Sequence, residues 1–134
     1  MKELFDVHCH MVPGVDDGAA DLEESLAMLK KQHEDGVRKI IITPHYRRRM
    51  FETPAKKVHE QFLKLQEAAK KEYPDMSLYL GCELHSNMDL QDILEKRKYV
   101  TMAGSSYVLL EFSEGDSAQH IRERVYNVLS CGYE

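Results

Sequence analysis

The sequence contains no apolar run that approaches the roughly 20 residues of a transmembrane helix, and Met1-Lys2-Glu3 leads into a strand-like segment instead of a signal peptide. Its three cysteines, Cys9, Cys82 and Cys131, are odd in number and far apart. This argues against a disulfide framework and fits a reducing compartment. We therefore expect a cytoplasmic protein that does not insert into a membrane.

An excess of positive charge is also missing. The 134 residues carry 18 Lys and Arg against 23 Asp and Glu, a formal net charge of -5. Such a chain has no general electrostatic attraction to DNA, RNA or an anionic membrane surface. We expect no nucleic-acid partner, and any anion must be held by a local site.

The cysteines lack the partner that one class of chemistry needs. Val15 and Met88 stand six residues after Cys9 and Cys82, where a cysteine-dependent tyrosine phosphatase carries an arginine, and no residue stands there after Cys131. Thiolate catalysis of that kind is excluded. We expect the cysteines to act as small buried hydrophobic residues.

The apolar residues switch repeatedly between strand and helix periods, which predicts one α/β domain spanning residues 1–134. About four strands with flanking helices are expected. The predicted strands are 4–8, 37–43, 77–80 and 107–112. The predicted helices are 22–35, 54–73, 90–98 and a last one that ends at Gly132.

The helix ends and stripes carry specific predictions. Asp21 to Glu24 reads as a capping box, and Thr53-Pro54 as an N-cap followed by a proline in the first turn. The apolar stripes predicted to face the core are Leu22, Leu26, Leu29 and His33; Val58, Phe62, Leu65 and Ala69; and Ile121, Val125, Val128 and Leu129.

Residue types that bind metals recur at the predicted strand ends, where parallel α/β folds gather their functional groups. These residues are His8, His10, His45, Glu83 and Glu111. An isolated His-x-His or a single Glu after a strand is unremarkable. The joint pattern at four successive strand ends predicts a metal site in one cleft.

Two neighbouring segments have alternative interpretations. Asp16-Asp17 either folds back over the site or forms a solvated Asp-Asp-Gly turn. Arg47-Arg48-Arg49 either offers guanidinium groups to a phosphate or is a plain charged loop. We expect the remaining histidines to be structural or solvated: His33, His59, His85 and His120.

Four segments together resemble a known family. They are Asp6 to Ala19, containing Pro13-Gly14-Val15-Asp16-Asp17-Gly18; Ile42 to Tyr46; Gly81-Cys82-Glu83; and Leu110-Glu111-Phe112. They resemble the PHP-family (polymerase and histidinol phosphatase) metal-dependent protein-tyrosine phosphatases of bacterial capsule and exopolysaccharide operons. The resemblance covers essentially the whole chain.

The resemblance implies the N-terminal part of a distorted (β/α)7 barrel that binds a cluster of divalent metals. Manganese is the common metal, with iron, zinc or magnesium as alternatives. The implied ligands are His8, His10 and Glu83 for one metal, Glu83 and Glu111 for a second, and Asp17 with His45 for a third. The implied catalytic residues are Asp17, Arg47 and Arg48. The implied partner is the phosphotyrosine-bearing tail of a tyrosine kinase that regulates polysaccharide synthesis.

The sequence departs from the family in lacking a later His-Pro-Glu-Arg strand end and an Asp-x-His. We therefore expect a domain truncated at its C-terminus, with little activity of its own and association with itself through an open sheet edge. Two alternatives stay open: an inactive fragment that binds metal or associates with itself, and a PHP phosphomonoesterase or nuclease. The acidic charge disfavours the nuclease.

Overall fold

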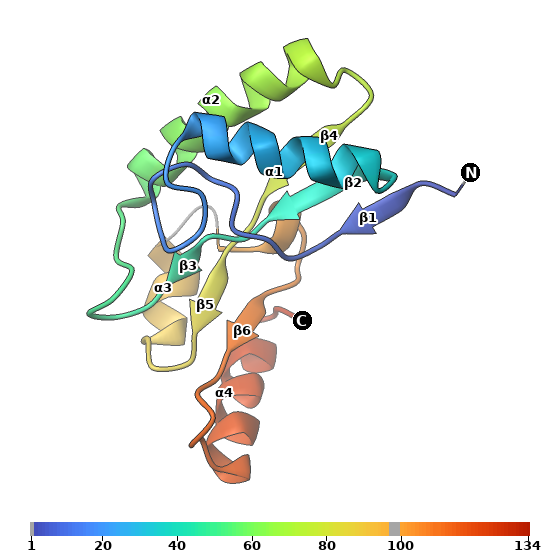
Figure 1. Cartoon of the computed structure of the whole chain (residues 1–134). Coiled ribbons are helices and arrows are strands. Elements are labelled where there is room, and N and C mark those ends of the chain that lie inside the picture. Colours follow the sequence, from blue (N-terminus) through green and yellow to red (C-terminus); the bar gives the residue numbers. More distant parts are fainter. Residues whose placement is uncertain (1, 97–99) are drawn as a thin grey trace.

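The computed structural model describes residues 2–96 and 100–134, which form an α/β fold (Figure 1). Six strands in these residues make two three-stranded sheets, ordered β1-β2-β4 and β3-β5-β6, and each strand pairs in parallel with its neighbour. Along the chain the elements are β1 (Leu4–Asp6), α1 (Leu22–Glu34), β2 (Val37–Ile42), β3 (His45–Tyr46), α2 (Ala55–Glu72), β4 (Ser77–Leu80), β5 (Glu83–His85), α3 (Leu90–Lys96), the short 3₁₀ helix η1 (Met102–Gly104), β6 (Leu109–Glu111) and α4 (Ala118–Ser130).

The expected number of strands, about four, is wrong, because two predicted strands are each followed by a second short one. β2 ends at Ile42. Two residues later, Pro44 has no backbone N–H that could donate to a neighbouring strand. Pairing resumes beyond it: the Gly81 N–H donates to the Ile42 carbonyl (2.8 Å) and the Glu83 N–H to the Pro44 carbonyl (3.0 Å). A Cβ at Gly81 would lie 3.0 Å from the sulfur of Met102, so this crossing favours glycine.

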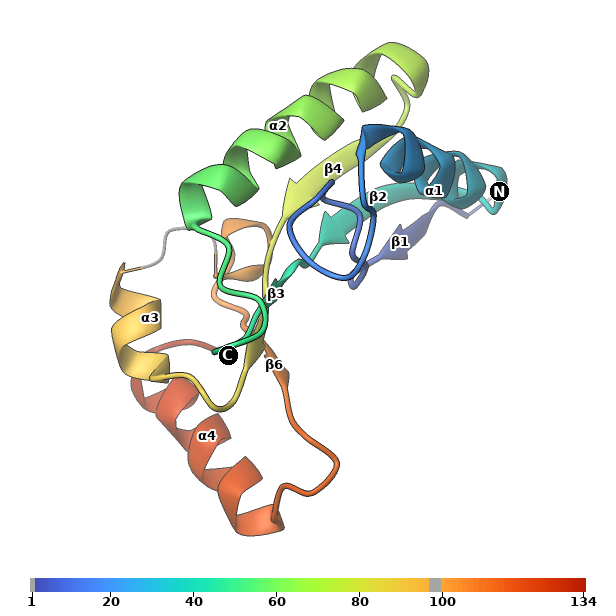
Figure 2. The ribbon, with the colours of Figure 1, turned by 60° about the vertical axis from the view of Figure 1, so that its left-hand side comes forward.

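Helices α1 and α2 pack on the β1-β2-β4 sheet around one hydrophobic core (Figures 1 and 2). The predicted stripe of α2 is confirmed, because Val58, Phe62, Leu65 and Ala69 are all buried. Burial of large side chains such as Phe62 and Leu65 stabilises the fold by about 1.5 to 3 kcal/mol each. No helix in the described ranges is both long and apolar enough to cross a bilayer.

The predicted stripe of α1 is only partly right. Asp21 caps the helix as expected, accepting a hydrogen bond from the Glu24 N–H at 2.9 Å. Leu22, however, is exposed, and Ser25 is fully buried in the next turn. The Ser25 hydroxyl donates to the Met11 carbonyl at 2.7 Å, so a polar residue attaches this helix to the loop before it.

The predicted N-cap of α2 is wrong. Pro54 occupies that position, and the helix has no side-chain cap hydrogen bond. The Thr53 hydroxyl instead donates to the Val15 carbonyl at 2.8 Å. This bond ties the start of α2 to the loop after β1.

A second hydrophobic core lies between α3, α4 and the β3-β5-β6 sheet (Figure 2). Of the stripe predicted for α4 only Val128 is buried, while Ile121, Val125 and Leu129 are exposed. The prediction for the helix over 90–98 is confirmed up to Lys96, and its last two residues lie outside the described residues. The predicted strand 107–112 shortens to β6, and 4–8 shortens to β1.

An open apolar hollow of about 470 Å³ lies on the face of the β1-β2-β4 sheet that is opposite α1 and α2. Val7, Ile41, Tyr107 and Leu109 are among its lining residues. Val7 and Tyr107 are more than half exposed, at 56% and 57%. The molecule therefore has a hydrophobic core on one side of this sheet and an exposed apolar surface on the other.

Candidate metal centre

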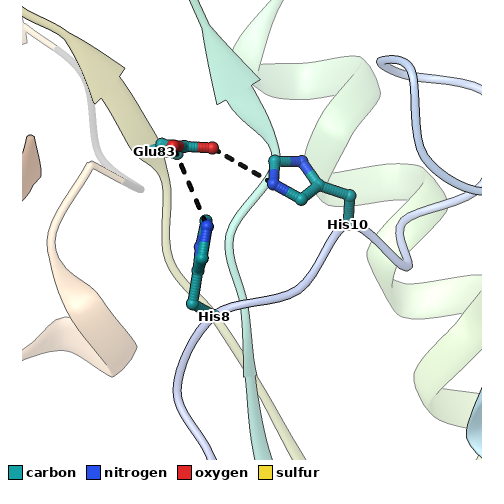
Figure 3. Close-up of side chains that lie close together, drawn as sticks. All are labelled: His8, His10 and Glu83. Atoms are coloured by element: carbon teal, nitrogen blue, oxygen red, sulfur yellow. Dashed lines mark ion pairs between the residues drawn. The ribbon is translucent and has the colours of Figure 1, made fainter. Parts of the chain in front are cut away.

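Three imidazoles and four carboxylates meet beyond the carboxyl ends of the parallel strands. Figure 3 shows His8, His10 and Glu83 with their side chains converging, and ion-pair distances link the others to them. The cluster consists of His8, His10, His45, Asp16, Asp17, Glu83 and Glu111. The five strand-end residues predicted to share one cleft come together in this cluster.

Strand register brings the central residues together. β3 pairs with β5 so that His45 lies directly beside Glu83, and residues paired in a parallel ladder project to the same face. His45 Nδ1 is 3.3 Å from Glu83 Oε2 and 3.5 Å from Glu111 Oε2. Two carboxylates therefore approach one ring nitrogen.

The loop after β1 folds back over this cleft, as one interpretation of the sequence predicted. Its apolar residues Met11 and Val12 are buried in the core, and the Ala19 N–H donates to the His10 carbonyl at 3.1 Å. A Cβ at Gly18 would lie 2.1 Å from that carbonyl oxygen, so only glycine permits the close approach. The fold brings Asp17 Oδ1 within 3.4 Å of His45 Nε2.

Asp16 lies inside the cluster, although the sequence left its position open between the site and a solvated turn and did not place it among the metal ligands. Its side chain is fully buried. One oxygen accepts from the His45 N–H (2.9 Å) and from His10 Nδ1 (2.9 Å), and the other accepts from the Gly18 N–H (3.0 Å). Burial raises the pKa of Asp16, but these hydrogen bonds outweigh burial and hold the pKa below its usual value. The Asp-Asp-Gly run was the available signal.

The two histidines of the His-x-His motif are oriented by hydrogen bonds at their Nδ1 atoms. His10 Nδ1–H donates to Asp16, which leaves Nε2 facing Glu83 Oε2 at 3.1 Å. His8 Nδ1 lies 2.7 Å from the Thr43 hydroxyl, whose own proton is directed to the Cys9 carbonyl at 3.3 Å. This arrangement also leaves His8 Nε2 facing Glu83, at 3.8 Å from Oε1. Thr43 was not predicted, because a buried threonine at a strand end has many structural uses.

The hydrogen bond that His10 donates to Asp16 is the largest cause of the raised pKa of His10, with burial opposing it and the charges of Asp16, Glu83 and Asp17 adding to it. A neutral His10 presents a lone pair to the Glu83 carboxylate. That contact is repulsive unless a proton or a metal cation lies between the two atoms.

Three buried polar atoms in the cleft have no hydrogen-bond partner: His45 Nδ1, Glu83 Oε2 and Glu111 Oε2. Leaving such an atom unpaired typically costs about 1 to 3 kcal/mol, and more for a charged group. Their convergence is the arrangement expected of metal ligands. Imidazole and carboxylate donors suit manganese, iron and zinc.

The ligand atoms form three overlapping groups within which every pair lies inside 4.8 Å. Ligand bonds of about 2.0 to 2.2 Å place ligand atoms roughly 3 to 4 Å apart, which these groups can meet. The groups are His8, His10 and Glu83; His10, Asp17 and His45; and His45, Glu83 and Glu111. The residues present therefore fit a metal cluster, and Glu83, which belongs to two of the groups, has two oxygens with which to serve two ions.

Of the arginines predicted to act in catalysis, the structure brings only Arg47 to the cleft. Arg47 Nη1 is 3.6 Å from Glu111 Oε1, and the Arg47 side chain is mostly buried. Arg48 is exposed and forms no ion pair with any acidic residue of the described chain. Its placement argues against direct contact with the cluster.

Cys9, between the two histidines, is partly buried against the hydrophobic core. Burial, with the nearby charges of Asp6 and Asp16, raises the pKa of its thiol to about 12. His85 is buried at the end of β5 and bonded to Ser113 at 3.1 Å, which fits the structural role expected of it.

The chain is similar to a known protein family and to individual members of it. The family model described as "Capsular polysaccharide synthesis, CpsB/CapC" matches residues 4–134. The tyrosine-protein phosphatase CpsB of Streptococcus pneumoniae is 40% identical over 129 residues, covering 96% of this chain and 53% of that protein. The tyrosine-protein phosphatase YwqE of Bacillus subtilis (strain 168) is 28% identical over 130 residues, covering 97% of this chain and 51% of that protein.

A crystal structure from work on YwqE of B. subtilis and CpsB of S. pneumoniae, described as unique metal-dependent tyrosine phosphatases, has the same fold over the matched part. The TM-score is 0.85 at 28% identity, and the match covers 97% of this chain and 53% of that one. The chain thus spans about half the length of the relatives it matches.

We predict that Asp16→Asn lowers the pKa of His10 in the metal-free protein, because the mutation removes the main cause of its elevation. NMR titration of the His10 ring in the presence of a chelator measures this. Asp17→Asn is the matched control and should lower the pKa less, since Asp17 acts only through its charge. Equal shifts in both variants would contradict the assignment.

We predict that Glu83→Gln weakens binding of Mn²⁺ by at least about 10 to 100-fold, the usual cost of altering groups around a metal site. Glu83 belongs to two of the three ligand groups. Isothermal titration calorimetry checks the prediction, with Glu114→Gln as a control that removes the same charge from an exposed position. Unchanged affinity in Glu83→Gln would be incompatible with this centre.

Proposed function

This chain belongs to the CpsB/CapC family of capsular polysaccharide synthesis, and on that premise we propose that its cluster is part of the active centre of a metal-dependent protein-tyrosine phosphatase. The proposal rests on the convergence of three buried atoms that have no hydrogen-bond partner, His45 Nδ1, Glu83 Oε2 and Glu111 Oε2. These atoms supply the anionic, multidentate environment that a cluster of divalent cations requires.

The proposed roles follow from the contacts in the cleft. Bound divalent metals, with manganese the first candidate, would supply Lewis acidity toward a phosphate and an activated water. Glu83 would bind two metal ions with its two oxygens. Asp17 approaches His45 from the solvent side. Asp16 fixes the His10 ring, and Arg47 offers its guanidinium to a phosphate oxygen at the Glu111 edge of the cleft.

Chemistry at Cys9 has no part in this proposal. A thiol with a pKa of about 12 is almost entirely protonated near neutral pH and is a poor nucleophile. We propose instead that water attacks phosphorus directly, so that no phosphocysteine intermediate forms at Cys9.

The proposed substrate is the phosphotyrosine tail of a bacterial tyrosine kinase that regulates capsule or exopolysaccharide synthesis. The family description and the phosphatase names of the relatives support this assignment. The proposed compartment is the cytoplasm, as expected from cysteine usage. The proposed complete fold is a distorted (β/α)7 barrel, of which the two parallel sheets would be one part.

We also propose that copies of this chain associate through the edge of β1 and the apolar hollow beside it. β1 pairs only with β2 among the described strands, and Val7 is 56% exposed at the hollow. Val7→Lys should shift the sedimentation coefficient toward that of a monomer, whereas Tyr126→Lys on the exposed surface of α4 should not. A wild-type chain that sediments as a monomer at all concentrations would disprove the association.

We predict phosphotyrosine hydrolysis in a chimera where residues 4–134 of this chain replace the matched part of S. pneumoniae CpsB. The chimera supplies the length that this chain does not match. Release of phosphate from a phosphotyrosine peptide should require Mn²⁺ and exceed release from histidinol phosphate or cleavage of single-stranded DNA. The 134-residue chain alone should be much less active.

Two variants of the chimera test the roles of its residues. Glu111→Gln should reduce the rate by at least about 10 to 100-fold, because it replaces a proposed metal ligand. Cys9→Ser should keep most of the activity. A chimera that is folded by circular dichroism and binds metal but hydrolyses no phosphotyrosine would overturn the proposed function.

A further inference from the structure

The segment that joins β3 to α2 contains an exposed arginine loop, defined here as residues 47–51 (Figure 1). The Arg47 N–H donates to the Phe51 carbonyl and the Phe51 N–H donates to the Arg47 carbonyl, each at 2.9 Å. At the tip Arg49 has a φ of 65°, the left-handed conformation that lets the chain reverse. Arg48, Arg49 and Met50 are exposed at this tip.

Both ends of the arginine loop are attached to the candidate metal centre. The Phe51 ring stacks on the His45 ring, with centroids 4.9 Å apart and an interplanar angle of 13°. Arg47 reaches Glu111. On one side of the tip the Arg48 N–H contacts the sulfur of Met88 at 3.1 Å. The loop is therefore held in place at the rim of the centre.

The charges at the tip are not neutralised by the protein. No carboxylate in residues 2–96 or 100–134 lies within ion-pair distance of the Arg48 or Arg49 guanidinium, and the nearby Glu52 carboxylate accepts from the Arg49 backbone N–H. Some exposed lysines pair with acids one helical turn away, as Lys31 does with Asp35 and Lys71 with Glu67, but no such partner lies beside Arg48 or Arg49 in the described residues. Two unpaired positive charges thus stand at the rim in a chain of net charge -5.

We propose that Arg48 and Arg49 recognise an acidic side chain next to the phosphorylated tyrosine of a peptide substrate, so that the arginine loop determines sequence preference. The inference rests on the proposed function. The tip residues are one and two positions from Arg47, at most about 3.8 and 7.6 Å away along the backbone. Neighbouring residues in an extended peptide are spaced at about 3.3 to 3.6 Å, so a flanking carboxylate comes within reach of the tip when the phosphate is at Arg47.

The geometry separates this role from binding of the phosphate itself. Arg47 is largely buried and directed at the cleft, whereas Arg48 and Arg49 lie outside it. A guanidinium binds carboxylates through paired N–H donors, which suits Glu or Asp in the peptide. Exposed Met50 adds an apolar surface beside the same peptide.

Binding measurements test the proposal independently of turnover. The Mn²⁺-loaded 134-residue chain is titrated with fluorescent peptides that carry a non-hydrolysable phosphonate analogue of phosphotyrosine, flanked either by Glu or by Ala. Fluorescence anisotropy gives the ratio of the two dissociation constants. We expect the Glu-flanked peptide to bind about fivefold to tenfold more tightly, with the difference shrinking as salt screens the charges.

Arg48→Ala with Arg49→Ala should reduce that ratio to about one. The matched control, Lys70→Ala with Lys71→Ala, removes the same charge from the far end of α2 and should keep the preference. A Glu-flanked peptide with unphosphorylated tyrosine should bind much more weakly than its phosphonate counterpart.

Three results would overturn the proposal: a ratio that survives the arginine substitutions, equal binding of phosphonate and unphosphorylated peptides, or no measurable binding of either phosphonate peptide. The function has a separate test in the chimera. Hydrolysis of phosphotyrosine without a flanking preference would refute the role of the loop alone, and flanking preference without hydrolysis would refute the function alone.

Discussion

The buried carboxylate of Asp16 is the interaction on which the rest of the centre depends. It accepts hydrogen bonds from the ring of His10, from the backbone of His45 and from the backbone of Gly18. These three groups belong to the first strand end, the third strand and the returning loop. One buried side chain therefore fixes the relative positions of segments far apart in sequence, and it does so while carrying a charge that burial opposes.

Asp16 also determines which atoms the neighbouring imidazoles present to the carboxylates. Because His10 Nδ1 is occupied, its Nε2 must face Glu83, and His45 is held so that both of its nitrogens face carboxylates. Four acidic side chains are collected at one edge of the sheets, and among the lysines and arginines of the described residues Arg47 alone forms an ion pair with one of them, Glu111. Cations that satisfied these groups would stabilise the folded chain as well as its chemistry, since binding energy and folding energy are linked in such sites.

The sequence predicted the parts of this arrangement that depend on local pattern. Apolar periodicity located the main helices and strands, and β4 and the buried face of α2 are as expected. Metal-binding residue types at strand ends predicted which side chains would meet. The end of the strand before Pro44 was predicted, but the resumption of pairing beyond Pro44 and the burial of Ser25 could not be predicted, because each depends on a partner supplied by tertiary packing. The burial of Asp16 could not be predicted either. Its neighbour Asp17 is the same residue type, and yet the Asp17 side chain is exposed.

The protonated thiol of Cys9 has a consequence for how such a centre withstands oxidative stress. Peroxide attacks thiolates, and phosphatases that use a low-pKa cysteine are inactivated when that sulfur becomes a sulfenic or sulfinic acid. Here Cys9 stands between His8 and His10 in the sequence and packs against the hydrophobic core, and its burial, together with the charges of Asp6 and Asp16, raises the pKa of its thiol to about 12. A phosphatase of the kind proposed for this centre would need no thiolate that peroxide could oxidise.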